Sequence, residues 1–202
     1  MKIELHNVSR ETIERLKVFE QVVKKWTRKI NLVSRADRDF IWDRHIRDSM
    51  QILDAAPIKF QHWLDLGSGG GFPGIVVAIA SVENRNAGKI TLVESDKRKA
   101  VFLQEALRET GCRATIVNER IENISDQKAD VVSARALANL TALIDLAKPH
   151  MTAAAVGVFP KGERWQEELG AARKKWSFDC TAHPSRLNPK AAILKIESIS
   201  HV

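Results

Sequence analysis

The sequence predicts an α/β fold: a mostly parallel sheet of seven strands, preceded by a helical extension. From residue 62 onward, short apolar runs alternate with amphipathic helical segments, the pattern of a parallel sheet covered by helices. Directly after the first apolar run, five glycines fall within the eight positions from Gly67 to Gly74. Residues 1–60 show helical patterns only. We therefore expect a helical extension at 1–60 and one globular core at 61–202.

The extension should contain two helices. Ser9 is a candidate N-cap for the first, whose apolar residues recur at spacings of three and four: Ile13, Leu16, Phe19, Val23, Trp26 and Ile30. This spacing places one apolar stripe on the helix and predicts core packing. The second helix should start at Asp37 or Asp39 and run to about Ala56, because Pro57 disfavours helical backbone in the residue before it.

In the core, strands are expected at 63–67, 89–94, 114–118, 130–134, 154–160, 177–182 and 191–197. Helices are expected at 73–82, 97–110, 139–149 and 163–175. No helical pattern separates the last two strands, which are divided only by a stretch containing Pro184 and Pro189. These two strands should therefore form an antiparallel hairpin at one edge of the sheet.

Composition narrows the class of protein. The chain has 202 residues, 44% of them hydrophobic and 28% charged, which is typical of a globular protein. Neither a membrane-spanning run nor a signal-peptide core is present, and Cys112 and Cys180 lack metal-ligand spacing. We expect a cytoplasmic protein without a metal. The net charge of +7 comes from the flanking segments 1–60 and 151–202. These segments either bind a polyanion or carry ordinary solvated surface charges, and charge alone does not distinguish the two.

The glycine cluster predicts a nucleotide-type cofactor site at the end of the first strand. Glycine permits positive φ and close approach of a ligand, and the amides that open the next helix favour polar or anionic groups. Gly69-x-Gly71-x-x-Gly74 matches a dinucleotide fingerprint. Gly67-x-Gly69-x-Gly71 after Asp65 matches the loop of S-adenosylmethionine enzymes. The glycines admit both, whereas Asp65 and the short chain favour the methyl donor.

Residues at the other strand ends complete the expected site, because ligands of such sheets bind at the carboxyl ends of the strands. Glu94 follows the second strand and can accept hydrogen bonds from ribose hydroxyls. Ile121 and Glu122 either cover and read an adenine or simply start a helix. Arg135, after the fourth strand, should pair with a carboxylate or phosphate. Lys161, after the fifth, is either a second such cation or an ordinary surface lysine.

Several motifs together resemble the glucose-inhibited division protein B (RsmG) family, and they span nearly the whole chain. They are Trp26-Thr-Arg-Lys-Ile-Asn-Leu32, Arg44-His-Ile-Arg-Asp-Ser49, Leu64-Asp-Leu-Gly-Ser-Gly-Gly-Gly-Phe-Pro-Gly74, Glu94-Ser-Asp-Lys-Arg-Lys99, Ala134-Arg-Ala136 and Lys161-Gly162. The resemblance implies a Rossmann-like class I S-adenosylmethionine-dependent methyltransferase that acts on N7 of guanine-527 in the 530 loop of bacterial 16S ribosomal RNA. One departure is Gly70, where many relatives carry proline, which should loosen the loop without abolishing binding.

The resemblance and the loop together give the expected site. The cofactor-binding residues are Gly67, Ser68, Gly69, Gly71, Phe72, Glu94, Ile121, Glu122 and Arg135. The expected substrate-binding residues are Arg44, His45, Arg135 and Lys161. Asp48 belongs to the same motif as Arg44, and a buried structural Arg–Asp pair is an equally open interpretation of that motif.

The implied reaction needs no proton-transfer catalyst. Guanine N7 carries a lone pair and no proton, so an in-line displacement there requires alignment and desolvation rather than a general base. The target guanine should lie in a loop or be extruded from its stack. The expected partner is 16S ribosomal RNA or the small ribosomal subunit, bound by a monomer. Two alternatives are a small NAD-dependent oxidoreductase and a non-catalytic RNA- or ribosome-binding protein.

Overall fold

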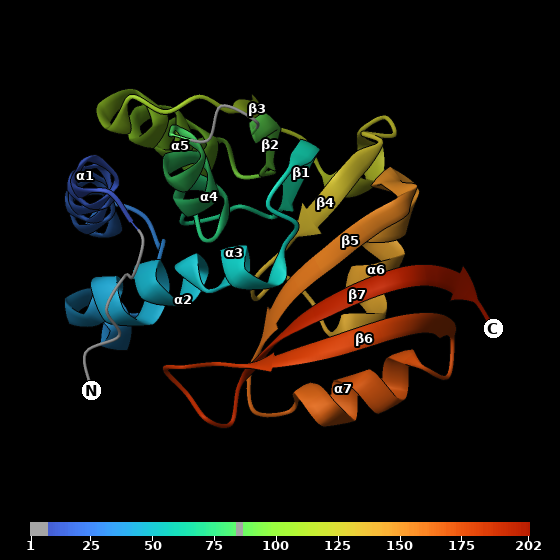
Figure 1. Ribbon diagram of the computed structural model, residues 1–202. Coiled ribbons are helices and arrows are strands. Elements are labelled where there is room, and N and C mark those ends of the chain that lie inside the picture. The colour runs from blue at the N-terminus through green and yellow to red at the C-terminus, as the bar shows by residue number, and fades with distance from the viewer. Residues whose placement is uncertain (1–7, 84–86) are drawn as a thin grey trace.

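The computed structural model of the protein describes residues 8–83 and 87–202, and its described part contains one seven-stranded sheet in the order β3-β2-β1-β4-β5-β7-β6 (Figure 1). The strands are β1 Phe60–Leu66, β2 Ala87–Val93, β3 Thr115–Val117, β4 Ala129–Ser133, β5 Met151–Lys161, β6 Trp176–Pro184 and β7 Ala192–His201. Strands β1 to β5 pair in parallel, whereas β7 is antiparallel to both β5 and β6. The mostly parallel sheet and the edge hairpin are confirmed.

Helices cover both faces of the sheet. The core helices are α4 Gly74–Ser81, α5 Lys97–Thr110, α6 Leu140–Ala147 and α7 Trp165–Ala172. Alternate residues of the central strands enter different apolar clusters. Trp63 and Val131 pack with α4 and α5, while Leu64 and Val132 pack with α6 and α7. This alternation is the period-two pattern of a strand buried on both sides.

The first helix of the extension forms as expected. Helix α1 spans Arg10–Thr27, and the Ser9 hydroxyl caps it by accepting a hydrogen bond from the Thr12 amide at 3.0 Å. Its apolar stripe, which includes Leu16 and Phe19, is buried against α4 and α5. Helix α1 is thus part of the core on that face of the sheet (Figure 1). The first seven residues of the expected extension lie outside the described part.

The prediction of one continuous helix between residues 37 and 56 is wrong. The segment is a 3-10 helix at Arg35–Phe40, a π-helical turn at Trp42–Ile46, and short α-helices α2 Arg47–Met50 and α3 Ile52–Ala55. The Asp37 carboxylate does not cap a helix; it accepts hydrogen bonds from the Ser34 hydroxyl and the Arg44 guanidinium, both at 2.6 Å. Both partners of Asp37 lie within seven residues of it in sequence, and the π-helical turn that follows is a feature frequent at functional sites.

Candidate functional site

The glycine loop follows β1 at the point where the strand order of the sheet reverses, between β1 and β4. Gly67, Gly69 and Gly71 have φ of 65°, 51° and 81°, values that an L side chain adopts only with strain. The Ser68 amide donates to the Val93 carbonyl at 3.0 Å, which ties the loop to the end of β2. The topological switch point is where ligands bind in open α/β sheets.

The loop is packed tightly against the N-terminal extension. A Cβ on Gly71 would lie 2.8 Å from the Phe19 ring of α1, and a Cβ on Gly70 would lie 2.9 Å from the Leu32 carbonyl oxygen. Both contacts are closer than ordinary van der Waals packing allows. Glycine at position 70 therefore lets the segment after α1 pass directly over the loop backbone.

Glu94 closes one side of the loop. One carboxylate oxygen accepts a hydrogen bond from the Gly69 amide and the other from the Asp96 amide, both at 2.8 Å. The Asn118 side-chain amide donates to the Glu94 carbonyl at 2.8 Å, which fixes the backbone as well. Each carboxylate oxygen keeps a second lone pair for a ligand hydroxyl.

Asp65 lies beneath the loop rather than in an open cavity. Its carboxylate is fully buried and accepts a hydrogen bond from the Ser133 hydroxyl at 2.7 Å. Ser133 in turn accepts one from the Trp63 indole at 2.8 Å. Burial raises the pKa of Asp65 to about 6, against the opposing effect of the Ser133 hydrogen bond. Asp65 thus joins the ends of β1 and β4.

A cavity of about 440 Å³ opens above the glycine loop, at the carboxyl ends of β1, β2 and β4. Of the residues expected to bind the cofactor, those that line it are Gly67, Gly69, Glu94, Ile121, Glu122 and Arg135. Ser68, Gly71 and Phe72 belong to the same loop but are outside this lining, and all three are almost fully buried. The cavity combines an apolar wall with a fixed carboxylate, a set of groups that fits a nucleoside.

Phe72 connects the loop to the extension. Its ring is 7% exposed, lies 5.2 Å from the Phe19 ring and stacks on the His45 imidazole at 5.0 Å between centroids. The Arg135 guanidinium lies 5.8 Å from the centroid of the same ring. The aromatic side chain expected at the cofactor thus packs on α1 and on two residues that line a second, larger cavity.

A second cavity, of about 840 Å³, adjoins the first, and the two share Arg135, Ala136 and Leu137. Arg44, His45, Asp48 and Lys161 line this larger cavity, so the structure brings all the expected substrate-binding residues to one place. Ala136 has a φ of 53°, a left-handed conformation that is uncommon for alanine and is often found at functional sites.

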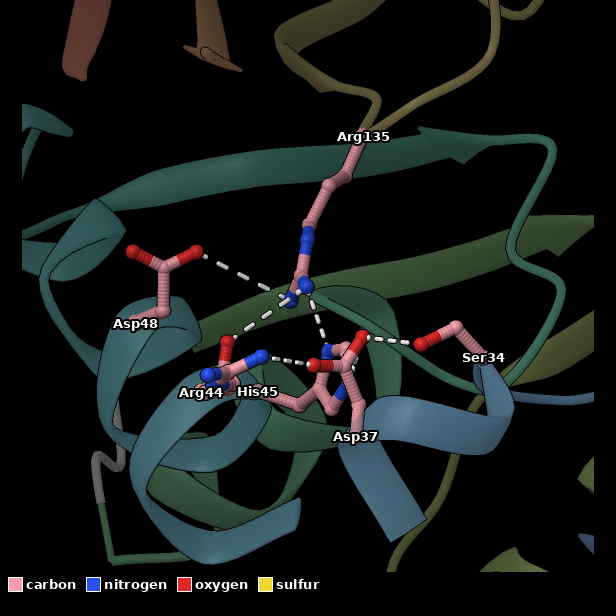
Figure 2. A network of polar contacts seen from close by, with 6 residues as sticks. All are labelled: Ser34, Asp37, Arg44, His45, Asp48 and Arg135. Carbon is pink, nitrogen blue, oxygen red and sulfur yellow. Dashed lines mark hydrogen bonds and ion pairs between the residues drawn. The ribbon is translucent and has the colours of Figure 1, made fainter. Parts of the chain in front are cut away.

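Arg135 is the centre of a polar network that reaches the π-helical turn (Figure 2). Its guanidinium hydrogen-bonds to Nδ1 of His45, lies 3.5 Å from the Arg44 carbonyl oxygen, and lies 3.8 Å from the Asp48 carboxylate. Burial and, after it, the positive charge of Arg135 together lower the pKa of His45 to about 4. His45 is therefore neutral near pH 7 and can accept the hydrogen bond.

Arg44 and Asp48 do not pair with each other. Arg44 pairs with Asp37 at 2.6 Å with its side chain 57% exposed, and Asp48 faces Arg135 instead (Figure 2). Burial raises the pKa of Asp48, and the charge of Arg135 acts in the opposite direction. The buried Arg44–Asp48 pair that the motif could have indicated is thus absent, because Arg44 pairs with Asp37 and Asp48 faces Arg135.

Lys161 lines the larger cavity, but its ammonium group has partners within the protein. The side chain is 8% exposed, forms an ion pair with Glu168 at 2.6 Å and donates to the Ala138 carbonyl at 2.8 Å. Glu168 also accepts a hydrogen bond from the Leu140 amide at 2.8 Å. Together the pair holds the segment between β4 and α6, which separates the two cavities.

The sequence predicts Asp37 only at the start of a second helix, and it predicts neither Ser133 nor Glu168 at the site. Each acts through a partner that is distant in sequence or in another element, and none belongs to a recognisable spacing. Within the described part of the chain, no three His, Cys, Asp or Glu side chains gather into a metal-binding group. No helix in residues 8–83 or 87–202 is long and apolar enough to cross a bilayer.

Comparison with solved structures identifies the fold. The chain superposes on the ribosomal protein L11 methylase from Lactobacillus delbrueckii subsp. bulgaricus with a TM-score of 0.62 at 17% identity, over 77% of this chain and 78% of that one. It superposes on M. jannaschii TYW2 in complex with AdoMet with a TM-score of 0.59 at 13% identity, over 87% and 80%. The fold is thus the Rossmann-like fold of S-adenosylmethionine-dependent methyltransferases.

Sequence comparison identifies the family. The chain is 50% identical to ribosomal RNA small subunit methyltransferase G of Ruegeria sp. (strain TM1040) over 97% of this chain and 95% of that protein. It is 44% identical to the protein of the same name from Parvibaculum lavamentivorans, over 96% and 87%. The family model described as GidB, rRNA small subunit methyltransferase G, matches residues 12–192. The chain belongs to the rRNA small subunit methyltransferase G family.

Proposed function

We propose that this protein transfers the methyl group of S-adenosylmethionine to N7 of a single guanine, position 527 in the 530 loop of 16S ribosomal RNA. The observation that supports this most directly is the pair of adjoining cavities at the carboxyl ends of the strands. The smaller fits a nucleoside cofactor, the larger is bordered by basic side chains, and both share the segment from Arg135 to Leu137.

The smaller cavity contains the groups needed to hold the cofactor. Glu94 offers its free lone pairs to the ribose hydroxyls, Ile121 offers an apolar surface to the adenine, and Glu122 lies at the rim. The amides of the glycine loop and the Arg135 guanidinium are suited to the carboxylate of the amino-acid part. Ser68, Gly71 and Phe72 are buried residues of the same loop and belong to the proposed cofactor site. When bound, S-adenosylmethionine supplies an electrophilic methyl group on a sulfonium.

The protein residues position the base and exclude water. Guanine N7 has no proton to remove, so no side chain needs to act as a general base, and we assign no catalytic residue. Arg44 has an exposed guanidinium near the cavity and is suited to an RNA phosphate. His45 and Arg135 shape the boundary between the cavities. Lys161 acts through the segment that it holds.

The partner in this proposal is 16S ribosomal RNA or the small ribosomal subunit. The net charge of +7 favours association with a polyanion. We further propose that the protein works as a monomer in the cytoplasm, without a metal ion.

The test is transfer of tritium from labelled S-adenosylmethionine to intact small subunits and to naked 16S ribosomal RNA, with the modified base mapped by borohydride–aniline cleavage. We expect label at one guanine N7. Arg135→Ala should weaken both cofactor binding and transfer, whereas Arg108→Ala, which removes an exposed arginine of α5, should change neither. Absence of label in every ribosomal substrate would refute the proposal. RNA binding without transfer would favour a non-catalytic protein, and binding of NAD instead would favour an oxidoreductase.

A further inference from the structure

We propose that Asp48 determines the base specificity of the enzyme by accepting hydrogen bonds from N1–H and the N2 amino group of the target guanine in the larger cavity. This inference rests on the proposed function, because it concerns how the same cavity selects its base. It assigns the recognition of guanine to one carboxylate among those that line the cavity.

The carboxylates around the cavity differ in what they already bind. Asp37, Asp48 and Glu168 line it. Asp37 accepts hydrogen bonds from Ser34 and Arg44, and Glu168 is bound by Lys161 and the Leu140 amide. Within the described part of the chain, the Asp48 carboxylate faces the Arg135 guanidinium at 3.8 Å, which is too long for a hydrogen bond. Asp48 therefore keeps its acceptor capacity.

The side-chain amides in the lining are also engaged. The Asn139 oxygen accepts a hydrogen bond from the Ala142 amide at the start of α6, at 3.0 Å. The Asn188 oxygen accepts one from the Lys190 amide, also at 3.0 Å. Among the three carboxylates that line this cavity, Asp48 thus keeps the most acceptor capacity for a ligand.

A carboxylate there selects guanine among the four bases. Guanine presents two adjacent donors, N1–H and the N2 amino group, which match the two oxygens of an ionised carboxylate. Adenine and cytosine place an acceptor next to a single amino group, and uracil places its one N–H between two carbonyls. Asp48 would therefore meet an unpaired acceptor on any other base, and such mismatches of buried polar groups give strong discrimination.

The arrangement also suits methylation at N7. N7 lies on the edge of the purine opposite N1 and N2, so a guanine held by Asp48 directs N7 away from this carboxylate. The segment from Arg135 to Leu137 lines both this cavity and the cofactor cavity. Burial raises the pKa of Asp48, and Arg135, at 3.8 Å (Figure 2), opposes this and favours the ionised form, which is the form that accepts two hydrogen bonds.

The experiment compares two substrates and three proteins. Small subunits are reconstituted with 16S ribosomal RNA that carries either guanosine or inosine at the target position; inosine lacks only the N2 amino group. The wild-type protein should methylate guanosine about 10- to 100-fold better than inosine in kcat/KM, the range for one hydrogen bond to a charged group. Asp48→Asn, which replaces one acceptor by a donor, should lower kcat/KM for guanosine about 100-fold and bring the guanosine-to-inosine ratio close to one.

Asp37→Asn is the matched control, since Asp37 lines the same cavity with its carboxylate already engaged. Its guanosine-to-inosine ratio should equal that of the wild type, whatever its overall rate. The affinity of each protein for S-adenosylhomocysteine, measured by calorimetry, separates effects on the cofactor site. Lower affinity in Asp48→Asn with an unchanged ratio would show that Asp48 acts only on Arg135, and would overturn the inference.

The wild-type ratio is a test that does not depend on the folding of any variant. Equal methylation of guanosine and inosine by the wild-type protein would overturn the inference and leave the proposed function intact. Absence of methylation of guanosine in every ribosomal substrate would instead overturn the proposed function, and this inference with it.

Discussion

Lys161→Met should destabilise the fold rather than remove a direct contact with RNA. The substitution keeps the length of the side chain but eliminates the ion pair with Glu168 at 2.6 Å and the hydrogen bond to Ala138 at 2.8 Å. Breaking a fully buried ion pair costs about 3–5 kcal/mol. Because Glu168 is 24% exposed and keeps the Leu140 amide, we expect a loss of about 2–3 kcal/mol.

The assay is equilibrium unfolding in urea, monitored by tryptophan fluorescence. In thermal unfolding, a chain of this size loses about 2–4 °C of melting temperature per kcal/mol, so the melting temperature should fall by about 5–10 °C. A double-mutant cycle with Glu168→Gln should give a coupling energy above about 1 kcal/mol. Lys175→Met is the matched control. Its ion pair with Asp145 has a similar length, 2.7 Å, but the side chains are 47% and 38% exposed, so the cost should stay below about 1 kcal/mol.

The outcome that would refute this reasoning is specific. If Lys161→Met unfolded like the wild type but failed to methylate or bind small subunits, the ammonium group would contact the substrate directly. The pairing with Glu168 would then be dispensable for stability.

Three further predictions concern the loop and the network. Glu94→Gln places an amide group opposite a backbone N–H, so the affinity for S-adenosylhomocysteine, measured by calorimetry, should fall at least about tenfold; an unchanged affinity would contradict the role of Glu94. The pKa of Asp65 is about 6 in the folded chain and 3.8 when unperturbed, so the folded state holds the proton more tightly. The unfolding free energy of the wild type, relative to Asp65→Asn, should therefore be highest below pH 4 and fall by about 3 kcal/mol as the pH rises from 4 through 6; a difference independent of pH would count against this. The pKa of His45 is lowered to about 4, so its contribution to stability is complete above pH 6.5 and is lost as the pH falls through 4. Its ring should show no titration by NMR between pH 8 and pH 5, and a midpoint near 6.5 would contradict the structure.

The positions that follow parallel strands could be predicted from the sequence. The carboxyl ends of β1, β2 and β4 meet at one edge of the sheet, so Gly67, Glu94 and Arg135 had to converge once the strands were identified. Helix α1 could also be predicted from the sequence, because its apolar stripe and its Ser9 N-cap are local signals. The division of the chain at residues 60 and 61 stays a prediction.

What the sequence did not reveal depends on partners far along the chain. The π-helical turn around His45 is associated with contacts to Phe72 and Arg135, and no local pattern reports them. The inward orientation of Phe72 depends on the position of α1, which periodicity does not fix. The pairing of Lys161 with Glu168 depends on the packing of α7 against α6. In each case the local pattern was compatible with several neighbours.

The contact of Phe72 and Gly71 with Phe19 makes the cofactor loop and α1 one cooperative unit. An opening of α1 would remove the surface on which the loop rests, although none of its residues lines the cofactor cavity. The free energy of local unfolding of α1 and the free energy of cofactor release would then be coupled. By reciprocity, occupancy of the cavity should slow amide hydrogen exchange in the middle of α1.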